Sequence, residues 1–343
     1  MYSVIRPLLF RLDPESAHRL TLSLLRLAGF FAPARWILQA VYFCQPKPVV
    51  AFGYQFTNPV GLAAGYDKDA MAVRGLAALG FGHLELGTVT PLPQAGNPKP
   101  RLFRLIEDEA VINRMGFPSK GSAFVMRRLE RLNIRSLNRD GVLLGINLGK
   151  NKNTPNEQAV FDYLSLLQNF APYADYLAIN ISSPNTPGLR ELQSRLALET
   201  LLTQLDSQRR LEEKRLEKRL PLLVKLAPDL SDSELDEILD VVLRTRMNGL
   251  ILTNTTVERG SLRSPFHNET GGLSGSPLAA RSEVILTRVK KQAGEKLPVV
   301  SVGGIQSSQD ARRRLDLGAS LVQIYTGLVY KGPGLVKQIV NGL

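Results

Sequence analysis

Cysteine and histidine are scarce in this sequence. Its 343 residues include one cysteine, Cys44, and three histidines. A single thiol cannot form a disulfide within the chain, and no Cys/His cluster has the spacing of zinc ligands. We therefore expect a reducing compartment and no bound metal, and a Ser/His/Asp catalytic triad has little support.

Long apolar runs are missing as well. The opening residues, MYSVIRPLLFRLDPE, lack the basic head, long apolar core and cleavage site of a signal peptide. Arg26, Arg35 and Lys47 interrupt the most apolar N-terminal stretch, and Pro33 lies inside it. Since a spanning helix needs about 20 mostly apolar residues in a row, we expect a protein that can touch a membrane but does not cross it.

The composition is that of an ordinary globular protein, with 44% hydrophobic and 22% charged residues. The length lies between one large α/β barrel and two smaller domains. The formal net charge of +12 suits nucleic acid, an anionic membrane surface or small anionic substrates. Charge alone does not choose among these partners.

A short aliphatic or β-branched run recurs eight times after about residue 55, and helical stretches separate the runs. The runs begin at Pro59, His83, Val142, Tyr176, Pro221, Asn248, Leu297 and Ala319. Most are apolar through their middles, as buried parallel strands are. Eight such β/α units predict a (β/α)₈ TIM barrel of the α/β class. A doubly wound sheet is the alternative, but no GxGxxG motif follows a strand.

Residues 1–44 stand apart from this pattern. Asp13-Pro14-Glu15 is typical of a helix start, and a second helix should begin near Pro33. Both helices are amphipathic, and five arginines against two acidic residues give the segment a net charge of +3. This N-terminal hairpin could lie on an anionic membrane surface, or its apolar faces could dock on the barrel of residues 45–343. The residues favour neither alternative.

The predicted strands end in polar residues, at the face where barrels of this type hold their active sites. These are Lys68, Thr88, Asn147, Asn180 with Ser183, Lys225, Thr253 with Asn254, and Tyr325 with Thr326. Amide, hydroxyl and ammonium groups suit a flat, hydrogen-bonding ligand, and the scarcity of carboxylates disfavours glycosidase chemistry. The glycine turns at 303–304 and 325–327 are candidates for binding a phosphate through backbone N–H groups.

Several long motifs resemble those of one enzyme family. The stretch NISSPNTPGLR, Asn180 to Arg190, is similar to the catalytic signature of dihydroorotate dehydrogenases. GLAAGYDKD, GTVTPLPQAGNPKPRLFRL, NRMGF, GINLGKNK, APDLSD, TNTT, TGGLSGSPL, VGGI and QIYTG follow the family's pattern between residues 61 and 327. The N-terminal hairpin and the serine in the signature resemble the quinone-dependent, membrane-associated class.

The resemblance implies oxidation of dihydroorotate to orotate in pyrimidine biosynthesis, with FMN as cofactor, a membrane quinone as electron acceptor and Ser183 as catalytic base. It places FMN against Ala63, Ala64, Gly65, Thr88, Asn147, Asn180, Lys225, Thr253, Gly275, Gly304, Tyr325 and Thr326. It assigns the substrate to Lys68, Asn113, Arg114, Met115, Gly116, Phe117, Asn180, Asn185, Asn254 and Thr255. His18, Arg104 and Tyr325 are expected on the quinone side.

The resemblance further predicts a monomer, attached peripherally to the cytoplasmic side of the cell membrane through the N-terminal helices, with no nucleic-acid partner. A soluble-acceptor enzyme of the same family is one rival, but it would have a cysteine in place of Ser183 and no hairpin. Another FMN barrel, such as a dihydrouridine synthase, would lack these motifs. A non-catalytic basic barrel that binds a membrane or nucleic acid is the third alternative.

Overall fold

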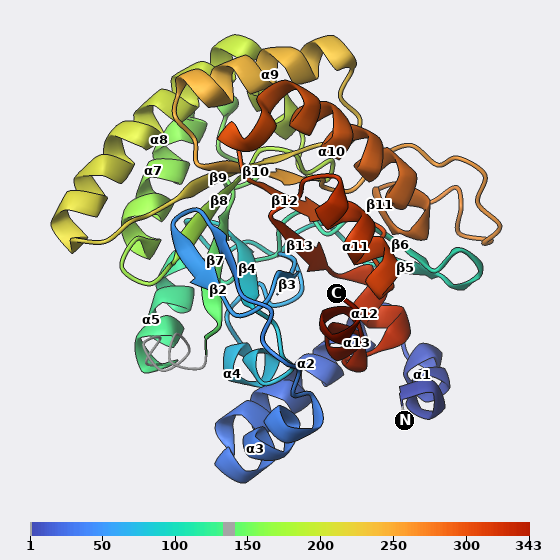
Figure 1. Cartoon of the computed structure of the whole chain (residues 1–343). Coiled ribbons are helices and arrows are strands. Elements are labelled where there is room, and N and C mark those ends of the chain that lie inside the picture. The colour runs from blue at the N-terminus through green and yellow to red at the C-terminus, as the bar shows by residue number, and fades with distance from the viewer. Residues whose placement is uncertain (1, 133–140) are drawn as a thin grey trace.

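The computed structural model describes residues 2–132 and 141–343 and contains a closed barrel of eight parallel strands (Figure 1). The strands are β3 (Val60–Leu62), β4 (His83–Val89), β7 (Leu143–Leu148), β8 (Tyr176–Asn180), β9 (Leu222–Leu226), β10 (Gly249–Leu252), β12 (Val299–Val302) and β13 (Leu321–Ile324). Each of the eight predicted runs contains one of them, and the pairing of β13 with β3 closes the barrel. The predicted TIM barrel is therefore confirmed.

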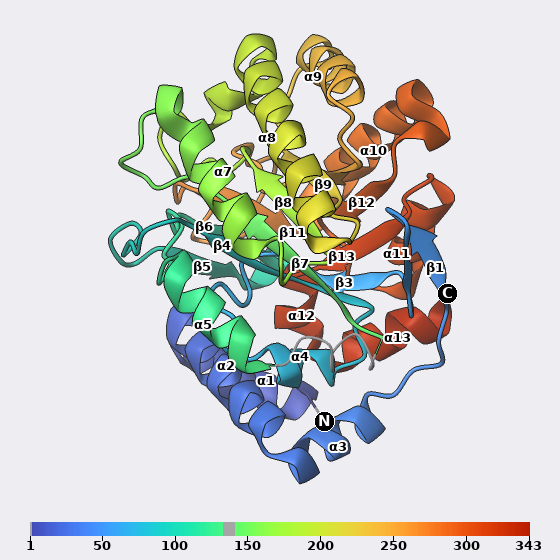
Figure 2. The same cartoon turned by 90° about the vertical axis from the view of Figure 1, so that its left-hand side faces the viewer.

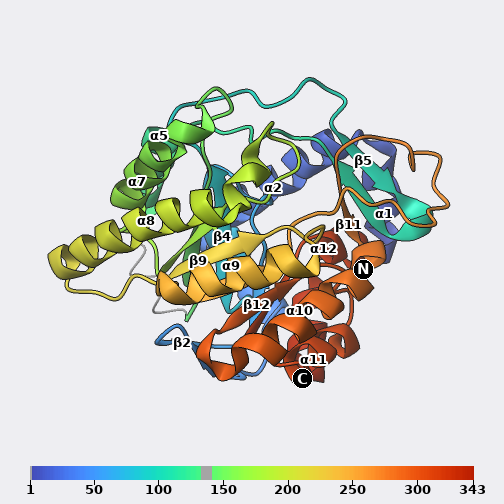
Figure 3. The same cartoon turned by 90° about the horizontal axis from the view of Figure 1, so that it is seen from above.

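Helices cover the outside of the barrel (Figures 1 and 3). They are α4 (Val73–Ala77), α5 (Ser122–Leu132), α7 (Ala159–Phe170), α8 (Arg195–Leu216), α9 (Asp232–Arg244), α10 (Ala279–Ala293), α11 (Ser308–Asp316), α12 (Thr326–Lys331) and α13 (Gly334–Gly342). The barrel strands are buried along their whole length because side chains fill the interior on one face and helices cover the other. Ser231 caps α9, and Glu234 completes a capping box.

Two small sheets were not predicted. The hairpin of β1 (Val49–Ala51) and β2 (Tyr54–Phe56) lies at the bottom of the barrel, where Phe56 packs edge-on against the His83 ring at the start of β4. A three-stranded antiparallel sheet of β5 (Leu102–Leu105), β6 (Ala110–Asn113) and β11 (Gly272–Gly275) lies at the opposite end, beside the strand ends. This second sheet contributes a wall of the candidate site.

The N-terminal segment forms three helices, α1 (Tyr2–Arg11), α2 (Pro14–Phe30) and α3 (Ala32–Val41). The two predicted helices are α2 and α3, and α1 precedes them. All three lie on one flank of the barrel, beside α4 and α12 (Figures 1 and 2). Among the residues that the structure describes, no helix combines the length and apolar character needed to cross a membrane.

The packing of α2 on α4 depends on glycine. A Cβ atom on Gly75 of α4 would lie 2.0 Å from the Leu25 carbonyl oxygen, so the two helix backbones can touch only because this side chain is missing. Docking buries Ala17 and partly buries Leu25, but it leaves Leu24 and Trp36 exposed. Docking on the barrel therefore accounts for only one face of these helices.

Candidate active site

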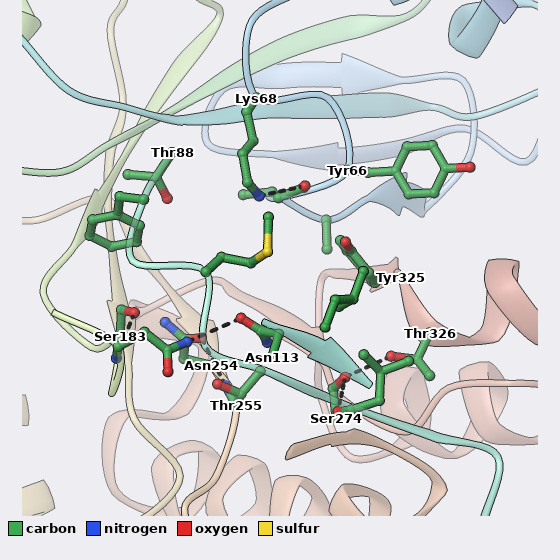
Figure 4. A pocket seen from close by; sticks show the side chains of 18 of the residues that line it. Tyr66, Lys68, Thr88, Asn113, Ser183, Asn254, Thr255, Ser274, Tyr325 and Thr326 are labelled. Carbon is green, nitrogen blue, oxygen red and sulfur yellow. Dashed lines mark hydrogen bonds between the residues drawn. The ribbon is translucent and has the colours of Figure 1, made fainter. Parts of the chain in front are cut away.

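A cavity of about 460 Å³ opens at the carboxyl ends of the barrel strands. Its walls come from the strand ends, from the sheet of β5, β6 and β11, and from α2. Cavities of this size hold small organic ligands. Figure 4 shows the cavity from close by, with Lys68 facing Ser183, Asn113 and Asn254 across it.

Most of the predicted site residues line this one cavity. Ser183 does so, as do all the predicted FMN residues except Asn147, all the predicted substrate residues except Arg114, and His18 and Tyr325 of the quinone set. These residues come from elements far apart in the sequence. The fold therefore brings together what the motifs indicated separately.

Asn147 lies beneath the cavity and orients two residues of its wall. Its side-chain oxygen accepts hydrogen bonds from Thr88 Oγ1 at 2.6 Å and from Asn180 Nδ2 at 3.0 Å. Its amide nitrogen donates to Glu85 Oε1 at 2.8 Å. Asn147 thus fixes the direction in which Thr88 and Asn180 present their remaining hydrogen-bonding atoms to a ligand.

The structure does not bring the guanidinium groups of Arg114 and Arg104 into the cavity. Arg114 forms an ion pair with Glu269 at 2.6 Å. Arg104 donates to the carbonyl oxygens of Leu9 and Phe10, each at 3.2 Å, and so ties β5 to the end of α1. Sequence alone did not indicate these directions, because both arginines lie in strands or loops whose partners are distant along the chain.

Ser183 lies in the loop that follows β8. The side chain is buried, and its Oγ accepts a hydrogen bond from the Asn185 N–H at 3.3 Å. The hydroxyl of Thr186, three residues on, is also buried and has no hydrogen-bond partner within the described part of the chain. A buried hydroxyl without a partner is costly, so Thr186 is placed to bond with a water or a ligand.

Asparagine side chains line the cavity together with Ser183. Asn185 Nδ2 donates to Asn113 Oδ1 at 3.1 Å, and Asn254 Nδ2 donates to Ser182 Oγ at 2.9 Å. These bonds hold the amide planes in fixed orientations. Because each amide carries two donors and an acceptor with two lone pairs, the group can match the alternating N–H and C=O edge of a pyrimidine ring.

Lys68 reaches into the cavity from the loop after β3, and its ammonium donates to the Gly65 carbonyl oxygen at 2.7 Å. Burial lowers the pKa of Lys68 to about 8. The free ammonium is thus less stable than in water, and a bound carboxylate would restore the lost stabilisation. This is the environment expected of a residue that binds an anionic substrate.

The turns after β12 and β13 are suited to a phosphate. Gly303 and Gly304 have φ angles of +117° and +77°, which favour glycine, and a Cβ on Gly304 would lie 2.5 Å from Ala279 Cα. Thr326 begins α12, and its Oγ1 lies 2.8 Å from Ser274 Oγ. Glycine turns at one end, with Lys225, Thr88 and the asparagines at the other, provide the donor groups that an FMN molecule requires.

An aromatic row connects α2 to the barrel. The rings of His18 and Tyr66 are 4.9 Å apart, and those of Tyr66 and Tyr325 are 5.7 Å apart, both edge-to-face. Burial, followed by the charge of Lys68, lowers the pKa of His18 to about 4. Burial also raises the pKa of Tyr66 to about 12. The row is therefore uncharged at neutral pH.

Glu15 and Arg101 line the cavity although the sequence did not predict them as site residues. Glu15 of α2 lines the cavity and accepts two hydrogen bonds from Arg101, at 2.9 and 3.1 Å. Arg101 also donates to the carbonyl oxygens of Ala95 and Asn97 in the loop below β5. The one available signal was Glu15 in the first turn of the predicted helix, which is equally typical of any helix start.

Comparison with known proteins gives concordant results. A family model for dihydroorotate dehydrogenase matches residues 48–343. A dihydroorotate dehydrogenase (quinone) of Idiomarina loihiensis is 49% identical over the whole of both chains, and one of Stenotrophomonas maltophilia is 49% identical over 100% of this chain and 96% of its own. A crystal structure of Eimeria tenella DHODH in complex with ferulenol superposes with a TM-score of 0.85, at 40% identity, covering 96% of this chain and 90% of that one.

Proposed function

The chain belongs to the dihydroorotate dehydrogenase family, and we propose that the cavity at the barrel mouth is its active site, with Ser183 as the base. The enzyme oxidises dihydroorotate to orotate, with FMN as cofactor and a quinone as electron acceptor. The family match and the quinone-dependent relatives thus confirm the predicted activity. One observation carries the site assignment. Lys68, Ser183 and the asparagine amides come from separate elements and converge on a single cavity.

Oxidation of dihydroorotate removes a proton from C5 and a hydride from C6. When bound, FMN would supply the acceptor for the hydride. Ser183 takes the C5 proton, and because an ordinary hydroxyl is a weak base, its own proton must pass onward at the same time. The buried Thr186 hydroxyl, or a water beside Phe117, is the proposed relay, which accepts this proton while passing one of its own on toward solvent.

The remaining polar residues orient the substrate. The Lys68 ammonium pairs with the substrate carboxylate, and this pairing offsets the free-energy cost of removing the ammonium from water. Asn113, Asn185 and Asn254 bond to the amide edges of the ring. Together these contacts hold C5 next to Ser183, and such positioning is itself a large part of catalysis.

The soluble-acceptor alternative would require a cysteine as the base. The one cysteine, Cys44, donates to the Gly80 carbonyl oxygen at 3.6 Å and is not among the residues that line the cavity. Ser183 stands where a soluble-acceptor enzyme of the family would have its cysteine. The quinone class therefore remains the assignment.

The N-terminal helices are proposed to attach the enzyme peripherally to the cytoplasmic side of the cell membrane and to guide the quinone. His18 and Leu22 of α2 line the cavity. The segment of α1 to α3 also exposes large apolar side chains, namely Val4, Leu8, Leu24, Leu27, Phe30, Phe31, Trp36 and Ile37. Apolar side chains on a basic helical segment favour an anionic membrane surface.

A monomer is proposed as the functional unit. The proposed base, substrate residues and FMN residues that line the cavity all come from one chain. Sedimentation of the flavoprotein in detergent would test this proposal. A stable dimer would contradict it.

The test of function is a visible spectrum of the purified protein, recorded anaerobically before and after dihydroorotate and then after a quinone. We expect a flavin band that dihydroorotate bleaches and the quinone restores, because the two half-reactions share one cofactor. A flavin band that dihydroorotate does not affect would leave the fold and cofactor in place but contradict the substrate. A colourless protein that takes up no FMN would contradict the function altogether.

A further inference from the structure

A carboxylate lies inside the barrel, below the cavity. Glu85 is the third residue of β4 and is fully buried. Its oxygens accept hydrogen bonds from Asn147 Nδ2 at 2.8 Å, Gln323 Nε2 at 2.8 Å and the Tyr176 hydroxyl at 3.3 Å. Lys225 Nζ lies 3.6 Å from Glu85 Oε1. Donors on four other strands thus point at one side chain in the barrel interior.

These contacts are those that a buried carboxylate requires. The amide nitrogens of Asn147 and Gln323 can only donate, so both carboxyl oxygens act as acceptors. A buried charge is tolerated only when it is hydrogen-bonded and paired. Within residues 2–132 and 141–343, Lys225 is the one cation that forms an ion pair with Glu85.

The network reaches the proposed FMN site at three points. Lys225 lines the cavity, and Asn147 joins Glu85 to Thr88 and Asn180, which also line it. No other acidic side chain pairs with Lys225 in the described part of the chain. The ammonium next to the cavity is therefore held from below by Glu85.

We propose that Glu85 is a positioning residue whose negative charge holds Lys225 and sets the reduction potential of the bound flavin, an inference that rests on the proposed function. Lys225 favours the negative charge that FMN acquires on reduction. Glu85 competes for the same ammonium and repels that charge, which makes the flavin a weaker oxidant and a better donor to quinone. Without Glu85, reduced FMN becomes the principal counter-ion of Lys225.

The experiment is a reductive titration of holoenzyme against a reference dye, comparing wild type with Glu85→Gln. We expect the two-electron potential of Glu85→Gln to rise, with at least a tenfold change in the equilibrium constant, or about 30 mV. The matched control is Tyr176→Phe, which removes a hydrogen bond to the same carboxylate without changing its charge, and Tyr176 does not line the cavity. This control should stay within a threefold change, or about 15 mV.

A potential for Glu85→Gln within that threefold range, or an equal shift in Tyr176→Phe, would overturn the proposal. Because the dye titration needs no dihydroorotate, its result is independent of whether that substrate bleaches the flavin. If Glu85→Gln does not fold, Glu85→Gln with Lys225→Met is the test, since removing both charges of a coupled pair should restore folded protein. Thermal denaturation without FMN measures this recovery, and no recovery would also overturn the proposal.

Discussion

The barrel and the N-terminal helices differ in how far their apolar side chains are buried. In the barrel, the aliphatic residues of β7 and β9 are buried along the whole strand. On α2 and α3, Leu27, Trp36 and Phe30 are exposed, with 82% of Phe30 accessible to solvent. The apolar side chains of the barrel are therefore buried within the chain, whereas many of those on α2 and α3 remain exposed to solvent.

The difference indicates where each region does its work. A barrel with a filled interior can hold polar groups at its mouth in fixed positions, as catalysis requires. Contiguous exposed apolar surface is rare on soluble monomers and marks a binding surface. The two regions meet at the cavity, where Glu15 of α2 pairs with Arg101 of the barrel. Separating them should therefore separate the two half-reactions.

Deletion of residues 1–44 should produce the largest effect. We expect quinone-dependent turnover to fall to background, because the α2 wall of the cavity and the exposed apolar surface are both lost. Orotate binding should remain measurable, since the proposed substrate contacts come from the barrel. Steady-state quinone assays and a spectral titration with orotate provide the two readouts. Normal quinone turnover by the truncated protein would show that the helices have no role in it.

Ser183→Ala tests the barrel side of the comparison. We expect FMN to remain bound while flavin reduction by dihydroorotate slows by about 10²- to 10⁴-fold, the usual contribution of a general base. Anaerobic stopped-flow absorbance measures this rate, and reoxidation by quinone should be unchanged. Ser194→Ala, at the start of α8 and outside the cavity, is a control that removes a hydroxyl elsewhere. A rate within threefold of wild type would mean that Ser183 is not the base.

The barrel was predictable because each strand is a nearly continuous apolar run. The sheet at the mouth was not, because it joins β6 to β11, and the Gly272-Leu-Ser-Gly275 stretch resembles a loop. Its pairing is with residues roughly 160 positions away, Gly272 with Asn113 for example. The α1 helix was also missed, since Pro7 lies inside it and proline usually breaks a helix.

The site was predictable in so far as strand ends converge at one face of the barrel. The directions of long side chains could not be predicted. The guanidinium groups of Arg104 and Arg114 bond to the Leu9 carbonyl oxygen and to Glu269, and the assignment of these two residues to ligands stays a prediction. Glu85 was missed although the strand HLELGTVT offered a signal. A carboxylate in the middle of a buried strand must have partners. Those partners lie on four other strands, so the sequence of one strand could not identify them.

Leu27→Glu tests the helix side of the comparison with a smaller effect. Transfer of a leucine side chain from water into the apolar part of a membrane is favourable by about 1.5 kcal/mol or more. Replacing this leucine by a charged glutamate should therefore weaken binding to anionic vesicles by about tenfold or more. Cosedimentation with such vesicles measures this. Leu196→Glu is the matched control because Leu196 is 79% exposed on α8, on the other side of the barrel (Figures 1 and 2). Equal losses in both variants would exclude a specific membrane face.

The mildest test changes pH rather than sequence and returns to the barrel. Because Lys68 has a pKa of about 8 in the free protein, its ammonium is lost as pH rises through that value. The kcat/KM for flavin reduction by dihydroorotate, which reports the free enzyme, should therefore fall about tenfold per pH unit above pH 8. Lys68→Arg keeps its charge to above pH 12 and should show no such fall. A flat wild-type profile, or the same fall in Lys68→Arg, would remove Lys68 from the recognition of the substrate carboxylate.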